Sequence, residues 1–92
     1  MEKNKITREK VEKYFLLTKT ALEEARKKII KEKEAKEIIE MVENYLSDAK
    51  YFQGKNDLIN AFAAINYSHG WLDSGARLNI FDVKNNKLFT IK

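Results

Sequence analysis

Apolar residues recur every three or four positions along most of this chain, and this spacing constrains its fold more than any other feature. One face of an α-helix presents side chains at that spacing, whereas one face of a strand presents every second residue. The first row follows Thr7, a candidate N-cap with Glu9 in the first turn. Its members are Val11, Tyr14, Phe15, Thr18, Ala21, Leu22, Ala25 and Ile29. The row predicts a helix over about residues 7–30.

The row loses its phase after Ile29, because Glu32 and Lys33 occupy the positions where the next apolar residues would fall. It resumes at Ala35 and continues to Phe52. We therefore expect a turn near residues 30–34 and a second helix over about residues 34–53. Neither Pro nor Gly marks this turn, so one long kinked helix is the alternative.

Gly54 follows the second row, and glycine commonly takes the left-handed position just past a helix end. Asn56 or Asp57 then caps a third helix, which we expect over about residues 57–78. The main face of this helix holds Leu58, Ala61, Phe62, Ile65, His69, Leu72 and Ala76. Both loops are short, so the helices should form an all-α, antiparallel up-down three-helix bundle in a single domain, residues 1–92.

Residues 79–92 have a different pattern. Phe81 and Val83, and later Phe89 and Ile91, are separated by polar residues at the period of a strand. Asn85-Asn86 between them suits a turn. The pattern predicts a short C-terminal β-hairpin or an extended tail. A lone hairpin is marginal in water, so this tail should pack against the bundle.

Composition limits the chemistry of the chain. It has no Cys and one His, which excludes thiol nucleophiles, Cys-ligated metals and multi-His sites within one chain. We expect neither a metal nor a cofactor. The net charge is +4, but 15 of the 18 basic residues are Lys and they are spread along the chain. That distribution favours a solvated surface over the clustered Lys and Arg of a dedicated nucleic-acid-binding face.

No segment resembles a membrane span. The longest apolar run, residues 61–65, is far shorter than the ~20 residues that a spanning helix needs. The charged N-terminus has no apolar stretch behind it, as a signal peptide would. We therefore expect a cytoplasmic protein with no membrane contact.

The third helix is almost free of Lys and Glu, so its surface beyond the core face is informative. One sector holds Ala64, Tyr67, Trp71 and Leu78. Tyr and Trp are favoured interface anchors, which suggests an interaction surface for another protein or a second copy. The alternative is that the tail folds back and covers this sector through Leu88, Phe89 and Ile91.

A second sector of the same helix is polar and holds Asn66, Gly70, Asp73 and Arg77. Asp73 and Arg77 have the spacing of an intrahelical ion pair. Gly70 would allow a ligand or another backbone to approach closely. The sector is either a small pocket for an anion or nucleotide, or a hydrogen-bonded patch that fixes helix packing or the tail.

His69 lies on the predicted core face, where a buried, hydrogen-bonded His is the more common finding. Asp73 is four residues further on, so the two side chains could meet. Ser68 and Ser74 lack the strand–turn–helix setting of a nucleophile elbow. We therefore assign no catalytic residue.

The second half of the chain resembles a known family. The resemblance rests on residues 45–52, Gly54, Asp57, residues 61–67 and the run Gly-Trp-Leu-Asp-Ser-Gly-Ala-Arg-Leu at residues 70–78. These residues are similar to the archaeal family called domain of unknown function 357, over about residues 41–89. The resemblance implies a short three-helix, spectrin-like or albumin-binding-like bundle in an archaeal cytoplasm, without an established activity.

Three hypotheses about function follow from the sequence. The first is a non-enzymatic protein-interaction module, for a protein partner or a second copy, that uses Tyr67, Trp71 and Leu78. The second is a nucleotide- or nucleic-acid-binding accessory domain that uses the positive charge and the polar sector. The third is a hydrolase that uses His69 and Asp73.

Overall fold

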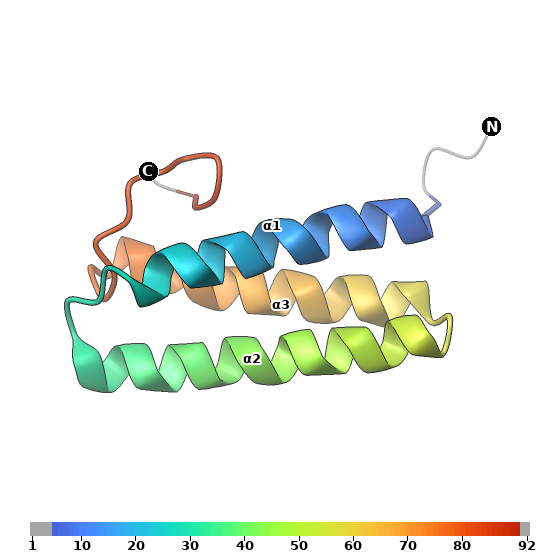
Figure 1. Cartoon of the computed structure of the whole chain (residues 1–92), viewed down its shortest axis with the longest axis horizontal. Coiled ribbons are helices and arrows are strands. Elements are labelled where there is room, and N and C mark those ends of the chain that lie inside the picture. Colours follow the sequence, from blue (N-terminus) through green and yellow to red (C-terminus); the bar gives the residue numbers. More distant parts are fainter. Residues whose placement is uncertain (1–4, 91–92) are drawn as a thin grey trace.

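Three antiparallel α-helices form one bundle in the computed structural model, which describes residues 5–90 (Figure 1). The helices are α1 (Arg8–Arg26), α2 (Glu32–Gly54) and α3 (Leu58–Arg77). α3 packs against both other helices, whereas α1 and α2 touch each other much less. The all-α three-helix bundle is confirmed, and the single kinked helix is excluded.

Two of the three helix starts have the side-chain caps that the sequence indicates. The Thr7 hydroxyl accepts a hydrogen bond from the Lys10 amide at 3.1 Å. The Asp57 carboxylate accepts one from the Asn60 amide at 3.2 Å. Each cap satisfies an amide that has no partner within its helix, so each fixes where the helix begins.

The prediction for Gly54 is wrong, because Gly54 is the last residue of α2 and has no left-handed backbone. Asn56 takes that conformation instead, with φ 59°. The Asp57 amide then donates to the Phe52 carbonyl at 2.8 Å, which closes the helix end as in a Schellman motif. Asn tolerates the left-handed region better than most residues because its short side chain bonds locally. Asn79, with φ 58°, ends α3 in the same way.

The first loop covers residues 27–31, so α1 ends before the expected residue 30 and α2 begins before residue 34. The reason lies far away in the sequence. The Ile30 amide donates to the Ile80 carbonyl at 2.8 Å, and the Asp82 amide donates to the Lys28 carbonyl at 2.7 Å. Ile29 and Phe81 thereby form an isolated antiparallel bridge. The tail thus provides hydrogen-bond partners for backbone groups of residues 28–31, which a longer helix would have paired within itself.

The predicted C-terminal β-hairpin is wrong for the described residues, since residues 79–90 form an extended tail with one turn. The amides of Leu88 and Phe89 both donate to the Asn85 carbonyl at 3.0 Å, which makes a helical turn rather than a strand pair. The alternation at Phe81 and Val83 reflects burial of both side chains against the bundle. Ile91 lies outside the described residues.

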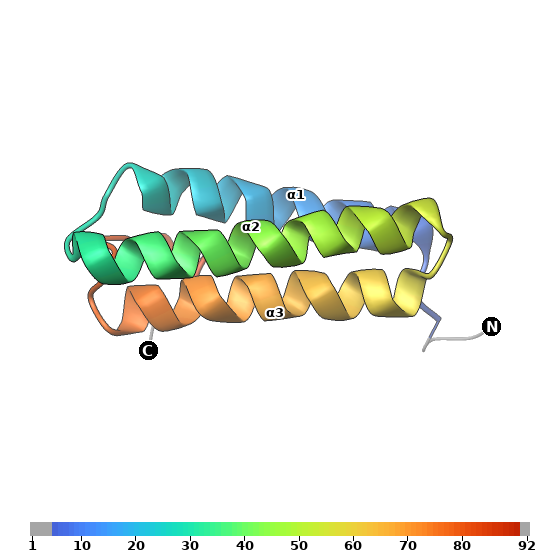
Figure 2. The ribbon, with the colours of Figure 1, turned by 90° about the horizontal axis from the view of Figure 1, so that it is seen from below.

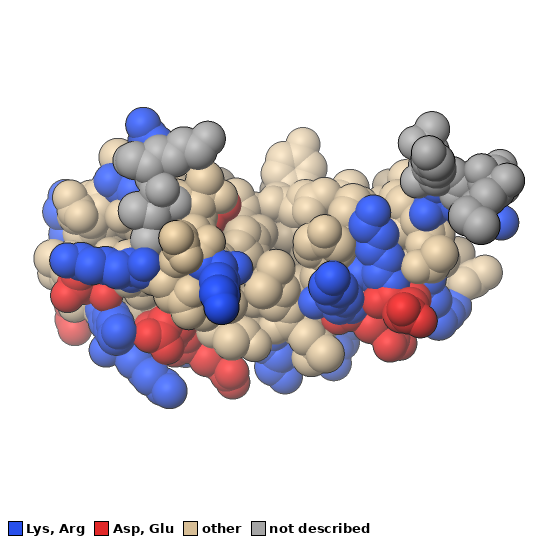
Figure 3. Space-filling model, turned by 90° about the horizontal axis from the view of Figure 1, so that it is seen from above, with Lys and Arg blue, Asp and Glu red and all other residues tan. Residues whose placement is uncertain are grey.

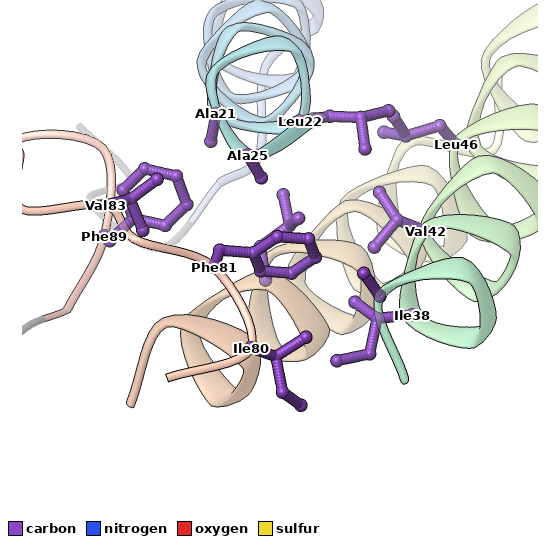
Figure 4. Packing of buried hydrophobic residues seen from close by; sticks show 12 residues of the cluster. Ala21, Leu22, Ala25, Ile38, Val42, Leu46, Ile80, Phe81, Val83 and Phe89 are labelled. Carbon is purple, nitrogen blue, oxygen red and sulfur yellow. The ribbon is translucent and has the colours of Figure 1, made fainter. Parts of the chain in front are cut away.

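The tail is a component of the core. Four of the twelve buried residues in the larger apolar cluster come from it, namely Ile80, Phe81, Val83 and Phe89. Figure 4 shows the Phe81 ring pointing into the space between Ala25 of α1, Val42 and Ile38 of α2, and the end of α3. The tail therefore closes the end of the bundle where α1 and α2 are joined (Figure 1).

Candidate functional site

α3 forms one edge of the bundle, seen along the bottom of Figure 2, and the surface of this edge is unusually apolar. Four large apolar side chains of its outer surface and ends are exposed: Ile59 (72%), Tyr67 (63%), Trp71 (39%) and Leu78 (61%). Between them lie small or uncharged residues. We call this surface the outer face of α3, defined as Ile59, Ala63, Asn66, Tyr67, Gly70, Trp71, Ser74 and Leu78. One charged side chain of α3, the exposed Arg77, projects on the same side as this face, at the end next to Leu78.

A shallow groove runs along the middle of the outer face. Its lining is Ala63, Asn66, Tyr67, Gly70, Trp71 and Ser74. The Tyr67 ring stacks on the Tyr45 ring of α2, with centroids 5.4 Å apart and planes at 17°. Stacking on a neighbouring helix holds Tyr67 in place, so the wall of the groove is formed before any partner arrives.

A second groove lies between α2 and α3, on the other side of Trp71. Its apolar lining comes from Ile38, Met41, Trp71, Leu78 and Ile80. Three glutamates of α2 also line it, Glu34, Glu37 and Glu40. Trp71 and Ser74 line both grooves, so they separate an uncharged groove from one that is also lined by glutamates.

Residues 79–90 leave Tyr67 and Trp71 accessible. The tail contacts the first loop and the side of α3 that faces α1, through Phe81, His69 and Asp73. Of the predicted interaction surface, Tyr67 and Leu78 are largely exposed and Trp71 is partly exposed. Ala64, which the sequence places in the same sector, is buried.

His69 joins three parts of the chain. Its Nε2 lies 2.6 Å from the Leu88 carbonyl oxygen, and its Nδ1 lies 2.9 Å from the Thr18 hydroxyl. A carbonyl oxygen only accepts, so Nε2 donates, and in the neutral ring Nδ1 then accepts from Thr18. His69 thus links α1, α3 and the tail.

Asp73 takes part in the same attachment. One oxygen of its carboxylate accepts from the Thr90 amide at 2.8 Å and lies 3.7 Å from His69 Nε2. Within residues 5–90, Arg77 is not within ion-pair distance of Asp73. The structure therefore brings His69 and Asp73 together and ties both to the tail.

Three of the four residues of the predicted polar site lie in one groove, and Arg77 lies outside it. Asn66 is exposed and shares a groove between α1 and α3 with His69, Gly70 and Asp73. Arg77 does not line that groove. In the described part of the chain, no three His, Asp or Glu side chains gather closely enough to hold a metal ion.

The sequence indicated the contact of His69 with Asp73 but not its hydrogen-bond partners Thr18 and Leu88. Thr18 stands in the apolar row of α1, and a hydroxyl at such a position signals a polar contact within the core. The Leu88 carbonyl could not be assigned, because its position depends on the path of the tail. Thr18 is 1% exposed, so its hydroxyl is a structural group that a substrate does not reach.

None of the described helices combines the length and the apolar character needed to cross a membrane. A family model described as "Protein of unknown function (DUF357)" matches residues 13–81. This match begins within α1, whereas the resemblance seen in the sequence begins near residue 41. It ends at Phe81, the tail residue that is buried in the core of the bundle. Neither a curated protein nor a solved structure matches the chain. Since the family model covers all but the start of α1, the whole of α2 and α3, and the first tail residues, the chain belongs to the DUF357 family.

Proposed function

We propose that the protein is a non-enzymatic interaction module whose binding surface is the outer face of α3. One observation carries this proposal: Tyr67, Trp71 and Leu78 remain exposed on a helix face where Arg77, at its C-terminal end, is the charged side chain, although the tail folds back onto the same helix. Contiguous apolar surface that a monomer leaves open commonly marks a contact site, and Trp and Tyr are frequent anchors of such sites.

The glycines of α3 support the proposal. A β-carbon at Gly75 would meet the Phe81 ring, so the bundle itself explains that glycine. A β-carbon at Gly70 would meet nothing within 4 Å. Gly in a helix interior costs about 1 kcal/mol relative to Ala, and the packing of a single chain gives Gly70 no compensation. Close approach of a partner's helix to the backbone at Gly70 would supply one.

The test compares two leucines that are equally exposed on different helices. Leu78 lies on the outer face of α3 with 61% exposure, and Leu16 lies on α1 with 62% exposure. Tagged wild-type protein, Leu78→Lys and Leu16→Lys are used to capture proteins from a native lysate, with and without nuclease. We expect a nuclease-resistant partner that Leu16→Lys retains and Leu78→Lys loses. A partner that both variants retain contradicts the proposal.

Nucleic-acid binding is the alternative that the same capture addresses. Lys and Arg side chains lie among Asp and Glu side chains on the face shown in Figure 3, and no single-sign surface stands out there. Binding through phosphates weakens steeply with salt. Material that disappears after nuclease treatment and at raised salt, together with an unaffected Leu78→Lys variant, would replace the interaction module by a nucleic-acid-binding domain.

A further inference from the structure

We propose that the partner of the outer face is a second copy of this chain, bound by antiparallel pairing of two α3 helices. The two-fold axis passes between Gly70 and Trp71. This inference rests on the proposed interaction function and adds the identity of the partner and the register of the contact. A two-fold contact uses the same patch on both copies, so the patch must be complementary to itself.

The residues of the outer face have the spacing that such a pair needs. Ala63, Tyr67, Gly70, Ser74 and Leu78 follow one another at intervals of four, three, four and four residues. Intervals of three and four keep side chains in the seam between two nearly aligned helices. α3 thus presents one continuous seam along its exposed side.

The order of large and small residues along this seam is self-complementary. Around a midpoint between Gly70 and Trp71, each of Tyr67, Trp71 and Leu78 stands opposite a small residue of the second copy, and Ile59 lies outside the paired segment. The pairs are Ala63 with Leu78, Tyr67 with Ser74, and Gly70 with Trp71. Each aromatic ring of one copy therefore enters a gap in the other, as knobs enter holes in helix packing. In a parallel pair in register, Tyr67 would meet Tyr67 and Gly70 would meet Gly70.

Gly70 leaves room for the Trp71 side chain of the second copy in this arrangement. Nothing in its own chain lies within 4 Å of the place where its β-carbon would be. In the pair, the Trp71 side chain of the second copy lies over that backbone. Trp71 is 39% exposed in a single chain, so a substantial part of its ring is available for this contact.

The paired residues supply part of the area that a stable pair requires. With about 200 Å² for each large side chain, the exposed fractions of Tyr67, Trp71 and Leu78 leave roughly 330 Å² open. Ala63, Asn66, Gly70 and Ser74 lie between them and add to this surface. A standard interface takes about 800 Å² from each partner, so the seam and the flanking Met41 of α2 correspond to a contact at the small end of the range.

Charge also favours the antiparallel orientation. The five seam residues are uncharged; Arg77 flanks them at the Leu78 end, and Glu34, Glu37 and Glu40 of α2 line the groove at that same end. A parallel pair would bring the two glutamate rows to the same end, where they repel each other. An antiparallel pair separates them and aligns the dipoles of the two α3 helices favourably.

The chain has no Cys, so single Cys substitutions can test the register. Ala63→Cys and Leu78→Cys proteins are prepared separately, since both positions are exposed. Each protein alone, and an equal mixture of the two, is treated with a short bismaleimide that spans the spacing of paired helices, about 8–10 Å. We expect cross-linked dimer in the mixture and almost none in either protein alone. In the antiparallel register, the thiols of two Ala63→Cys copies lie about 22 Å apart along the axis.

Three other results would overturn the self-pairing. Cross-linking of Ala63→Cys with itself would show a parallel register. Equal cross-linking of the mixture and of an Ala63→Cys plus Leu16→Cys mixture would show random collision, because Leu16 lies on α1. A single-chain mass at every concentration in sedimentation equilibrium, with no cross-linking, would show that no pair forms.

The last result separates this inference from the proposed function. If the chain sediments as a monomer while Leu78→Lys still loses a captured protein that Leu16→Lys retains, the second copy is the wrong partner and the interaction module stands. If the chain is a monomer and Leu78→Lys loses nothing, both proposals are contradicted.

Discussion

Gly75 of α3 lies directly against the Phe81 ring of the tail: a β-carbon added at position 75 would stand 2.5 Å from Phe81 Cε2. It would also stand 3.2 Å from Ile38 Cδ1 of α2. The missing side chain at Gly75 is thus what allows the tail to enter the bundle. Gly70, five residues earlier on the same helix, has no such neighbour.

Gly75→Ala should therefore lower the free energy of unfolding by about 1–3 kcal/mol, the usual effect of overpacking a core. Gly70→Ala is the matched control, and in dilute solution it should raise the free energy of unfolding by about 0.4–1 kcal/mol. Urea denaturation followed by circular dichroism measures both. Equal effects of the two substitutions would contradict the difference in their surroundings.

His69→Ala should loosen the tail and destabilise the bundle. It removes the contact with the Leu88 carbonyl and leaves the buried Thr18 hydroxyl without a partner, which costs about 1–3 kcal/mol. Hydrogen exchange should rise most at the amides of residues 80–90. Asn66→Ala, an exposed position on the same helix, should leave both the stability and the exchange of the tail unchanged. Tail exchange that is the same in His69→Ala and wild type would show that His69 does not hold the tail.

Phe81→Ala should be among the most damaging single substitutions, with a loss of about 3–5 kcal/mol. The ring is 1% exposed and fills the space between all three helices. Lys87→Ala, at an exposed position of the same tail, is the control and should be nearly neutral. Thermal unfolding midpoints suffice for the comparison. If Phe81→Ala melted like Lys87→Ala, the tail would not be a part of the core.

The end of α2 gives a prediction that reverses the expectation from sequence. Gly54 has a helical backbone and open space around it, so Gly54→Ala should stabilise the protein by about 0.4–1 kcal/mol. Asn56→Ala should destabilise it by about 1 kcal/mol, because Ala is strained in the left-handed region. Asn56→Gly should be less destabilising than Asn56→Ala, because Gly adopts the left-handed backbone without strain, although it also loses the hydrogen bond from Arg8. A destabilising Gly54→Ala would restore the sequence-based assignment.

Local patterns predicted the parts of the fold that depend on neighbouring residues. The apolar rows located three helices, Thr7 was identified as a cap, and Asp57 was one of the two candidates with Asn56, because these signals act within one turn of helix. The assignment of the left-handed position to Gly54 was wrong because the bond from the Asp57 amide to the Phe52 carbonyl closes the helix two residues later, at Asn56. The predicted end of α1 was wrong because the tail, about fifty residues away in the sequence, supplies hydrogen-bond partners to the residues after Arg26.

In the candidate site too, local patterns predicted some features and missed those that depend on distant residues. The exposure of Tyr67 and Leu78 follows from the angular positions of these residues on α3, so periodicity alone placed them outside the core face. The bonds of His69 and Asp73 involve Leu88 and Thr90, whose positions depend on how the whole tail turns at Asn79 and Asn85. No short-range pattern encodes that path.

Trp71 is the only tryptophan of the chain, and it lies on the seam of the proposed pair. Its emission spectrum and its quenching by acrylamide therefore report pairing. Measured from about 1 μM to about 1 mM protein, they detect a pair whose dissociation free energy is about 4–8 kcal/mol. We expect the emission to shift to shorter wavelength and the quenching to fall as the concentration rises, and Gly70→Leu to abolish both changes while the helical content is retained. Emission and quenching that stay constant over the whole range would contradict the pairing of two α3 helices.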